Sequence, residues 1–174
     1  YHEHFSYLSL AAVENLLARH GLHVFDVEHL TTHGGSLRIF AERTTFANRA
    51  ESEALVDQRR HERTVGVGDP AFYQAFGRRV QGVIGSVRKF LADAKRDHRT
   101  VAAYGAAAKG NTLLNACGVT SAEIAFVVDR NPYKQGRFLP GTHIPVYAPE
   151  HLSETRPDFI FILPWNLKEE IARD

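Results

Sequence analysis

The spacing of apolar residues predicts a helix and then a β-hairpin in the first part of the chain. Residues 9–19 (SLAAVENLLAR) place apolar side chains three and four apart, with Ser9 as the N-cap and Gly21 after the end. The stretches LHVFDVEHL and SLRIFAE then alternate apolar and polar residues, as strands do. Because the glycine turn TTHGG separates them, residues 22–42 are predicted to form an antiparallel hairpin.

A second helical pattern follows a polar, irregular segment. Residues 44–68 carry many charges, with helical tendency only in ALVDQRRHER, and we expect a domain boundary there. Asp69 as N-cap and Pro70 in the first turn then predict the start of a long helix. Its apolar residues recur at helical spacing: Phe72, Phe76, Val80, Val83, Val87 and Leu91. Three glycines interrupt this pattern, and either close packing on a neighbour or a bend would explain them.

From Thr100 onward, short apolar runs alternate with helical segments. VAAYG, EIAFVVD, HIPVY and DFIFILPW are predicted strands, and AAAKGNTLLNACG, residues 148–152 and NLKEEIARD are predicted helices. Strands that alternate with helices indicate a parallel sheet with right-handed crossovers. The predicted class is therefore α/β, with a Rossmann-like parallel sheet preceded by a helix and an antiparallel strand pair.

Composition narrows the classes of protein that fit. The 174 residues carry a net charge of +1 and no long basic tract, so neither nucleic acid nor a membrane surface is expected as a partner. Cys117 is the only cysteine, which excludes an internal disulfide and a cysteine zinc cage and favours the reducing cytoplasm. The chain has no methionine and stops at NLKEEIARD, within a predicted helix, so we expect a piece of a longer protein.

The segment Gly105-Ala106-Ala107-Ala108-Lys109-Gly110 has the spacing of a dinucleotide fingerprint with alanine in its central position. It follows a predicted strand and opens a predicted helix, whose first N–H groups favour phosphate. Asp129 ends the next strand, where a ribose-binding acid lies in Rossmann units. However, the Ala107 methyl group obstructs a dinucleotide pyrophosphate, so NAD is disfavoured. A tight strand-to-helix turn that requires small residues explains the same spacing equally well.

Four stretches together resemble one family: YHEHFSYLS, THGGSLR, YGAAAKGNTLLNACG and VVDRNPYKQGRFLPGTHIPV. They are similar to sugar C-methyltransferases that act on nucleotide-linked deoxy-keto sugars. The resemblance implies a parent with an N-terminal zinc-binding domain, a class I methyltransferase domain that uses S-adenosylmethionine, and a C-terminal Rossmann-like domain. Residues 1–45 would then end the methyltransferase domain, with the last helix and antiparallel strand pair of its sheet. Residues 46–68 would be a linker, and residues 69–174 the Rossmann-like domain. The preceding parts would bind zinc and most of the S-adenosylmethionine.

The resemblance also assigns roles to the first residues. Methylation beside a ketone requires a base that removes a proton and leaves an enolate, and histidine titrates near neutral pH. In the family's Tyr-x-Glu-His motif the matching residues are Tyr1, Glu3 and His4. His4 is the expected base, Glu3 would orient it, and Tyr1 would contact the sugar or the enolate oxygen and is the alternative base. Because HEH lacks the spacing of HExxH, we expect no metal here.

Substrate contacts are expected from two regions. For the nucleotide or pyrophosphate we expect Gly105 and Gly110 of the loop and Lys109, Asn111 and Thr112 at the helix start. Lys134, Gln135, Trp165 and Asn166 follow strands at the ligand-binding edge of the predicted sheet. Trp165 could stack on a base or plug the core, and His33, Ser36 and Arg38 could contact substrate or serve only the hairpin turn.

The expected activity is transfer of a methyl group from S-adenosylmethionine to a nucleotide-diphosphate sugar, with thymidine as the expected nucleoside. Two rival hypotheses remain open. One is a non-catalytic Rossmann-like module that binds a nucleotide or a partner protein. The other is an intact NAD-dependent enzyme, against which Ala107 and the lack of a substrate domain count.

Overall fold

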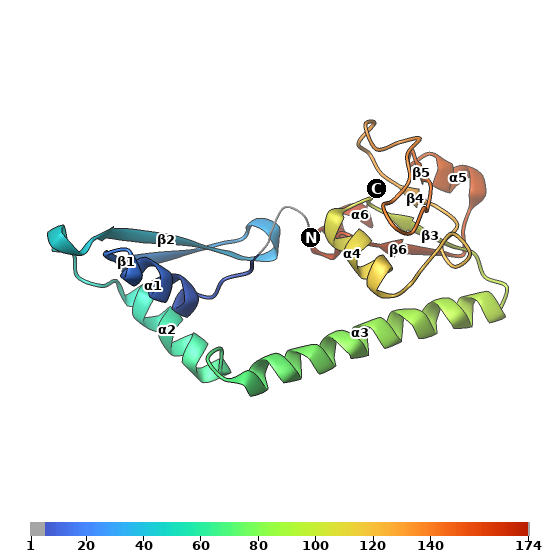
Figure 1. The fold of residues 1–174 in the computed structure, drawn as a ribbon. Coiled ribbons are helices and arrows are strands. Elements are labelled where there is room, and N and C mark those ends of the chain that lie inside the picture. Colours follow the sequence, from blue (N-terminus) through green and yellow to red (C-terminus); the bar gives the residue numbers. More distant parts are fainter. Residues whose placement is uncertain (1–5, 174) are drawn as a thin grey trace. The chain divides into compact units, whose positions relative to one another are not determined.

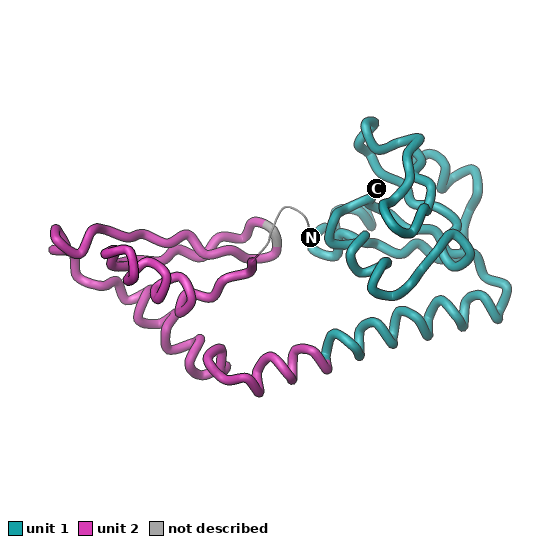
Figure 2. The backbone as a smooth tube through the Cα atoms, viewed as in Figure 1, with its two compact units in different colours: residues 1, 79–174 teal, residues 2–78 magenta. Residues whose placement is uncertain are grey.

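The computed structural model describes residues 6–173, without the side chain of His33. The chain divides into two compact units, of which the first ends at Arg78 and the second begins at Arg79 (Figure 2). We call them the first unit and the second unit and describe each by itself. No helix in the described part of the chain has both the length and the apolar composition needed to cross a membrane.

The first unit contains the predicted helix and hairpin. Helix α1 (Leu10–Arg19) begins after Ser9, whose hydroxyl accepts a hydrogen bond from the Ala12 N–H at 3.2 Å. Strands β1 (Leu22–Leu30) and β2 (Ser36–Arg43) pair antiparallel around the 3₁₀ turn η1 (Thr32–Gly34), and a second such turn, η2 (Thr44–Phe46), follows (Figure 1). Leu10, Val24, Val27 and Leu55 form its buried core. The predicted helix and antiparallel strand pair are confirmed.

Helix α2 (Glu53–Val65) lies within the segment that we expected to be a linker. Both carboxylate oxygens of Glu62 accept backbone N–H groups at the start of α1, from Leu10 at 2.7 Å and Ala11 at 3.0 Å. Arg59 pairs with Glu14 of α1 at 2.7 Å and with Glu51 at 2.6 Å. The charges that made residues 46–68 look irregular in the sequence therefore hold α2 against α1.

Helix α3 (Pro70–Arg96) is continuous, and Asp69 caps it by accepting the Ala71 N–H at 2.8 Å. Its C-terminal half buries Ile84, Leu91 and Ala94 in the second unit. A Cβ atom built on any of its glycines, Gly77, Gly82 or Gly85, would meet no described atom within 4 Å. Contacts within the described chain therefore do not support close packing as the reason for these glycines.

The second unit is built on four parallel strands in the order β5-β4-β3-β6 (Figure 1). Numbered by their sequence within this unit, the strands lie in the order 3-2-1-4, which matches the first four positions of the Rossmann order 3-2-1-4-5-6. The strands are β3 (Val101–Tyr104), β4 (Val127–Val128), β5 (Val146–Tyr147) and β6 (Phe159–Ile162). The predicted parallel α/β sheet is confirmed, although β4 and β5 have fewer paired residues than their apolar runs suggested.

Helices cover the two faces of this sheet unequally. Alternate residues of β3, Val101 and Ala103, share a core with Leu91 of α3 and Leu114 of α4 (Ala108–Ala116). On the other face, Ala102 packs with a smaller cluster bordered by α5 (His151–Thr155). The short elements η3 (Trp165–Leu167) and α6 (Lys168–Ile171) follow β6. Helices α3 and α4 therefore cover one face of the sheet, whereas in the described part of the chain the other face is covered only by the short helix α5.

Candidate functional site

The neighbouring strands β3 and β6 end where the strand order reverses, which is where α/β sheets usually bind ligands. Gly105 follows β3 and Pro164 lies two residues after β6. Gly105 has a φ of +88°, and a Cβ atom there would lie 2.5 Å from the Cγ atom of Pro164. The two loops are therefore in contact, and Gly105 is required both by its backbone conformation and by the proline ring beside it.

Gly110 at the other end of the GAAAKG segment also has a packing role. A Cβ atom on it would lie 2.6 Å from the Cβ atom of Leu163, which is itself buried. The tight-turn interpretation thus accounts for both glycines of the fingerprint. A phosphate-binding role must then rest on the backbone N–H groups at the start of α4.

The start of α4 lacks a side-chain cap, because Ala107 occupies the N-cap position. An uncapped first turn presents N–H groups and the positive end of the helix dipole to an anion. Lys109 and Thr112 are exposed on this helix, and the Thr112 hydroxyl donates to the Ala108 carbonyl at 3.0 Å. Asn111 is half-buried. These residues all lie in the first two turns of α4, and their contact with a diphosphate stays a prediction.

Asp129, expected at the ribose position of a dinucleotide site, is already engaged by the protein. Its carboxylate accepts the Ala106 N–H at 2.7 Å, the Asn131 N–H at 2.8 Å and the Lys134 ammonium at 3.0 Å. Lys134 also donates to the Ala106 carbonyl at 2.9 Å. The backbone N–H and the backbone carbonyl of Ala106 are thus held by the two partners of one ion pair. A carboxylate offers about four acceptor positions, so little capacity remains for a ribose.

Lys134 therefore fixes the loop after β3, through the Ala106 carbonyl, and both Lys134 and Gln135 contact Asp129 at the end of β4. Gln135 donates from its side-chain amide to the Asp129 carbonyl at 2.9 Å. Trp165, by contrast, is 63% exposed, which excludes the core-plug interpretation and leaves the ring accessible at the sheet edge. Asn166 is exposed beside it.

The hairpin candidates lie in the first unit. Ser36 donates to the Thr32 carbonyl at 3.3 Å, and Arg38 pairs with Glu28 at 2.7 Å across the two strands. Both residues therefore have roles within the hairpin, and His33 lies in η1. The predicted catalytic residues Tyr1, Glu3 and His4 lie outside the described residues. Among residues 6–173, no group of three or more His, Cys, Asp or Glu side chains could hold a metal ion.

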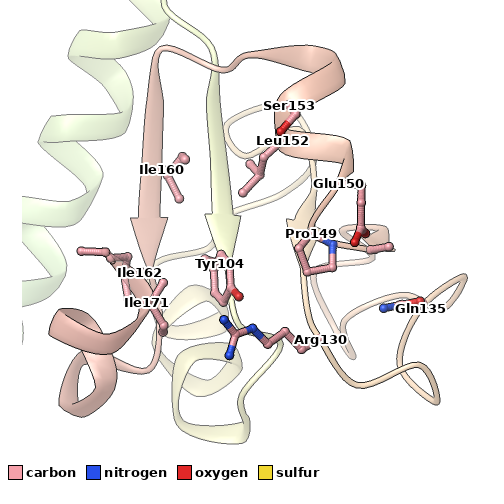
Figure 3. A pocket seen from close by; sticks show the side chains of 12 residues that line it. Tyr104, Arg130, Gln135, Pro149, Glu150, Leu152, Ser153, Ile160, Ile162 and Ile171 are labelled. Atoms are coloured by element: carbon pink, nitrogen blue, oxygen red, sulfur yellow. The ribbon is translucent and has the colours of Figure 1, made fainter. Parts of the chain in front are cut away.

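A groove of about 910 Å³ opens on the less covered face of the sheet (Figure 3). Tyr104 from the end of β3 and Ile160 and Ile162 from β6 line it, with Arg130 at the end of the groove near the carboxyl edge. Sequence analysis missed these residues as a site. The available signal was the alternation in β6, which places Ile160 and Ile162 on one face of the sheet.

Comparison with known proteins agrees with this fold. The family model described as the C-methyltransferase C-terminal domain matches residues 31–174. The chain belongs to this family. C-methyltransferase NovU from Streptomyces niveus is 39% identical over 171 residues, which is 98% of this chain. The chain spans 40% of the length of that relative. The resemblance to the C-terminal part of a C-methyltransferase is therefore confirmed.

The match to the C-methyltransferase C-terminal domain begins inside the hairpin and continues through both units. It therefore includes β2, α2 and the whole parallel sheet. The boundaries expected from the sequence, 1–45, 46–68 and 69–174, stay predictions. The division into two compact units falls within α3, after Arg78.

Proposed function

We propose that the chain is the C-terminal portion of an enzyme that methylates the carbon beside the ketone of a nucleotide-diphosphate-linked deoxy-keto sugar. Similarity to C-methyltransferase NovU along 98% of the chain carries this proposal. S-adenosylmethionine, when bound, supplies the methyl group as an electrophile. His4 removes the proton beside the ketone, and the resulting enolate carbon accepts the methyl group. Glu3 orients His4, and Tyr1 contacts the sugar or takes the base role instead.

The described residues offer little to S-adenosylmethionine or zinc. A pocket between α1 and α2 in the first unit has a volume of about 210 Å³, below the roughly 300–1,000 Å³ of typical ligand sites. No zinc-binding cluster occurs among residues 6–173. We expect the isolated chain to bind no S-adenosylmethionine and to show no methyl transfer, and turnover of a keto-sugar nucleotide by this chain would contradict that expectation.

The substrate's diphosphate binds, on this proposal, at the start of α4. The uncapped first turn supplies N–H donors, and Lys109 adds a positive charge on the same helix end. Trp165 and Asn166 are exposed after the adjacent strand. The engaged carboxylate of Asp129 supports a nucleotide-diphosphate sugar, with thymidine as the proposed nucleoside, over a nicotinamide dinucleotide.

The test of the base uses the full-length protein that carries this sequence. Replacing His4 with asparagine should lower turnover by roughly 100-fold or more, as loss of a general base does, while S-adenosylmethionine affinity stays unchanged. His2→Asn is the matched control, because His2 falls at the variable position of the Tyr-x-Glu-His motif. Near-normal turnover of His4→Asn would remove His4 from the base role and point to Tyr1.

The test of the diphosphate site is calorimetric. Lys109→Ala should weaken thymidine diphosphate binding by about 1–3 kcal/mol, the usual range for a charged hydrogen bond. The loss should shrink as salt rises, because part of it is screened charge. Lys89→Ala, which removes an exposed lysine from α3, is the control. Unchanged binding by Lys109→Ala, or tighter binding of NAD than of the diphosphate, would show that the loop is only a structural turn.

A further inference from the structure

The groove on the less covered sheet face is open to solvent and has a mixed lining, with an isoleucine floor and the polar residues Gln135, Glu150 and Ser153. Ile160 is 48% exposed although it lies within a strand. Leu152 of α5 and Ile171 of α6 form the sides of the groove (Figure 3). The face is open because α5, which connects β5 to β6, has only five residues and covers little of the sheet. All the lining residues belong to the second unit, so the groove is complete within it.

The polarity of the groove changes along its length. Figure 3 shows the Arg130 guanidinium turned toward Tyr104, at the end of the groove where β3 stops. Tyr104 immediately precedes Gly105 of the loop that leads into α4. Arg130 follows Asp129, whose carboxylate holds the Ala106 N–H of that loop at 2.7 Å. The end of the groove that holds Arg130, which pairs with Glu170 at 4.0 Å, is thus joined to the loop in front of the α4 N-terminus.

We propose that this groove binds the nucleoside part of the nucleotide-diphosphate sugar. This inference rests on the proposed function, which assigns the diphosphate of the same ligand to the start of α4. The nucleobase has flat faces, which suit a floor of isoleucine side chains on a sheet. The diphosphate attached to the nucleoside is anionic, which suits the end of the groove that holds Arg130. The volume of about 910 Å³ lies within the range of small-molecule sites.

Saturation-transfer NMR with thymidine diphosphate tests this assignment on the 174-residue chain. For the unaltered chain, the base protons should receive the strongest saturation. Ile160→Gln replaces an apolar part of the floor without adding charge, and it should weaken binding about tenfold, because the base loses apolar contact area. Val83→Gln is the matched control, because Val83 is 54% exposed on α3 and lies outside the groove.

Parallel titrations with pyrophosphate and with Lys109→Ala separate this inference from the proposed function. If thymidine diphosphate binds, Lys109→Ala weakens it and Ile160→Gln behaves like Val83→Gln, the groove assignment is overturned and the diphosphate site stands. If Ile160→Gln weakens binding and Lys109→Ala does not, the groove assignment stands and the diphosphate site falls. Absence of thymidine diphosphate binding at millimolar concentration would overturn the groove assignment.

Discussion

Replacing Gly110 with alanine tests whether packing alone requires a small residue in α4. In a helix interior, alanine is favoured over glycine by about 1 kcal/mol. Here the new Cβ atom would lie 2.6 Å from the Cβ atom and 3.2 Å from the Cγ atom of Leu163. Leu163 is only 5% exposed, and its Cβ atom cannot rotate away from the contact. Overpacking of this kind costs about 1–3 kcal/mol, so the net effect should range from neutral to about 2 kcal/mol of destabilisation.

Gly85→Ala is the matched control, because a Cβ atom on Gly85 in α3 meets no described atom within 4 Å. It should stabilise the protein by about 1 kcal/mol. Subtracting the two changes in unfolding free energy cancels the helix-propensity gain and leaves the overpacking cost of about 1–3 kcal/mol. Urea denaturation followed by circular dichroism gives these values, and thiol labelling of buried Cys117 reports the second unit alone. Equal stabilisation by both substitutions would refute the packing explanation of Gly110.

Three further predictions concern the second unit. Asp129→Ala should lower the unfolding free energy of this unit by about 1–3 kcal/mol, because the part-buried N–H groups of Ala106 and Asn131 lose their acceptor. Asp129→Asn keeps one side-chain carbonyl and should lose less in the same urea titration. Hydrogen bonds from the Thr100 backbone, the Arg99 side chain and the Thr100 hydroxyl lower the pKa of Asp158 to about 2. The unaltered chain should therefore have a higher unfolding free energy than Asp158→Asn, with the full difference present above pH of about 4. This difference should disappear as the pH falls through the lowered pKa of Asp158. A difference that does not change with pH would contradict this prediction. Burial raises the pKa of the Cys117 thiol. Labelling of Cys117 by a disulfide reagent at pH 8 should therefore be slow in the folded chain and fast in urea. Equal labelling rates in the two conditions would contradict this prediction.

Local patterns predicted most of the fold. The cap at Ser9, the alternation around TTHGG and the Asp69-Pro70 start each specify an element through neighbouring residues, and each element formed. The strand–helix alternation after Thr100 likewise predicted the parallel sheet. Helix α2 was harder to place, because its polar residues look solvated until Glu62 and Arg59 are seen against α1.

The site was less predictable, because its geometry depends on contacts between segments far apart in the sequence. Nothing near Asp129 in the sequence shows that its carboxylate accepts the Ala106 N–H, 23 residues away. The packing of Pro164 against Gly105 likewise depends on pairing of β3 with β6. The alternatives for Trp165 could be separated only by its exposure.

These contacts change what the GAAAKG segment can indicate about ligands. A glycine fingerprint normally suggests a pyrophosphate because the missing side chains leave space for one. In this chain Pro164 and Leu163 occupy the space beside Gly105 and Gly110. The features of this segment that suit an anion are the uncapped start of α4 and the positive charge of Lys109 on its first turn. Such a site depends on charge and N–H donors more than on close backbone approach, which suits the diphosphate of a nucleotide sugar and makes its affinity sensitive to salt.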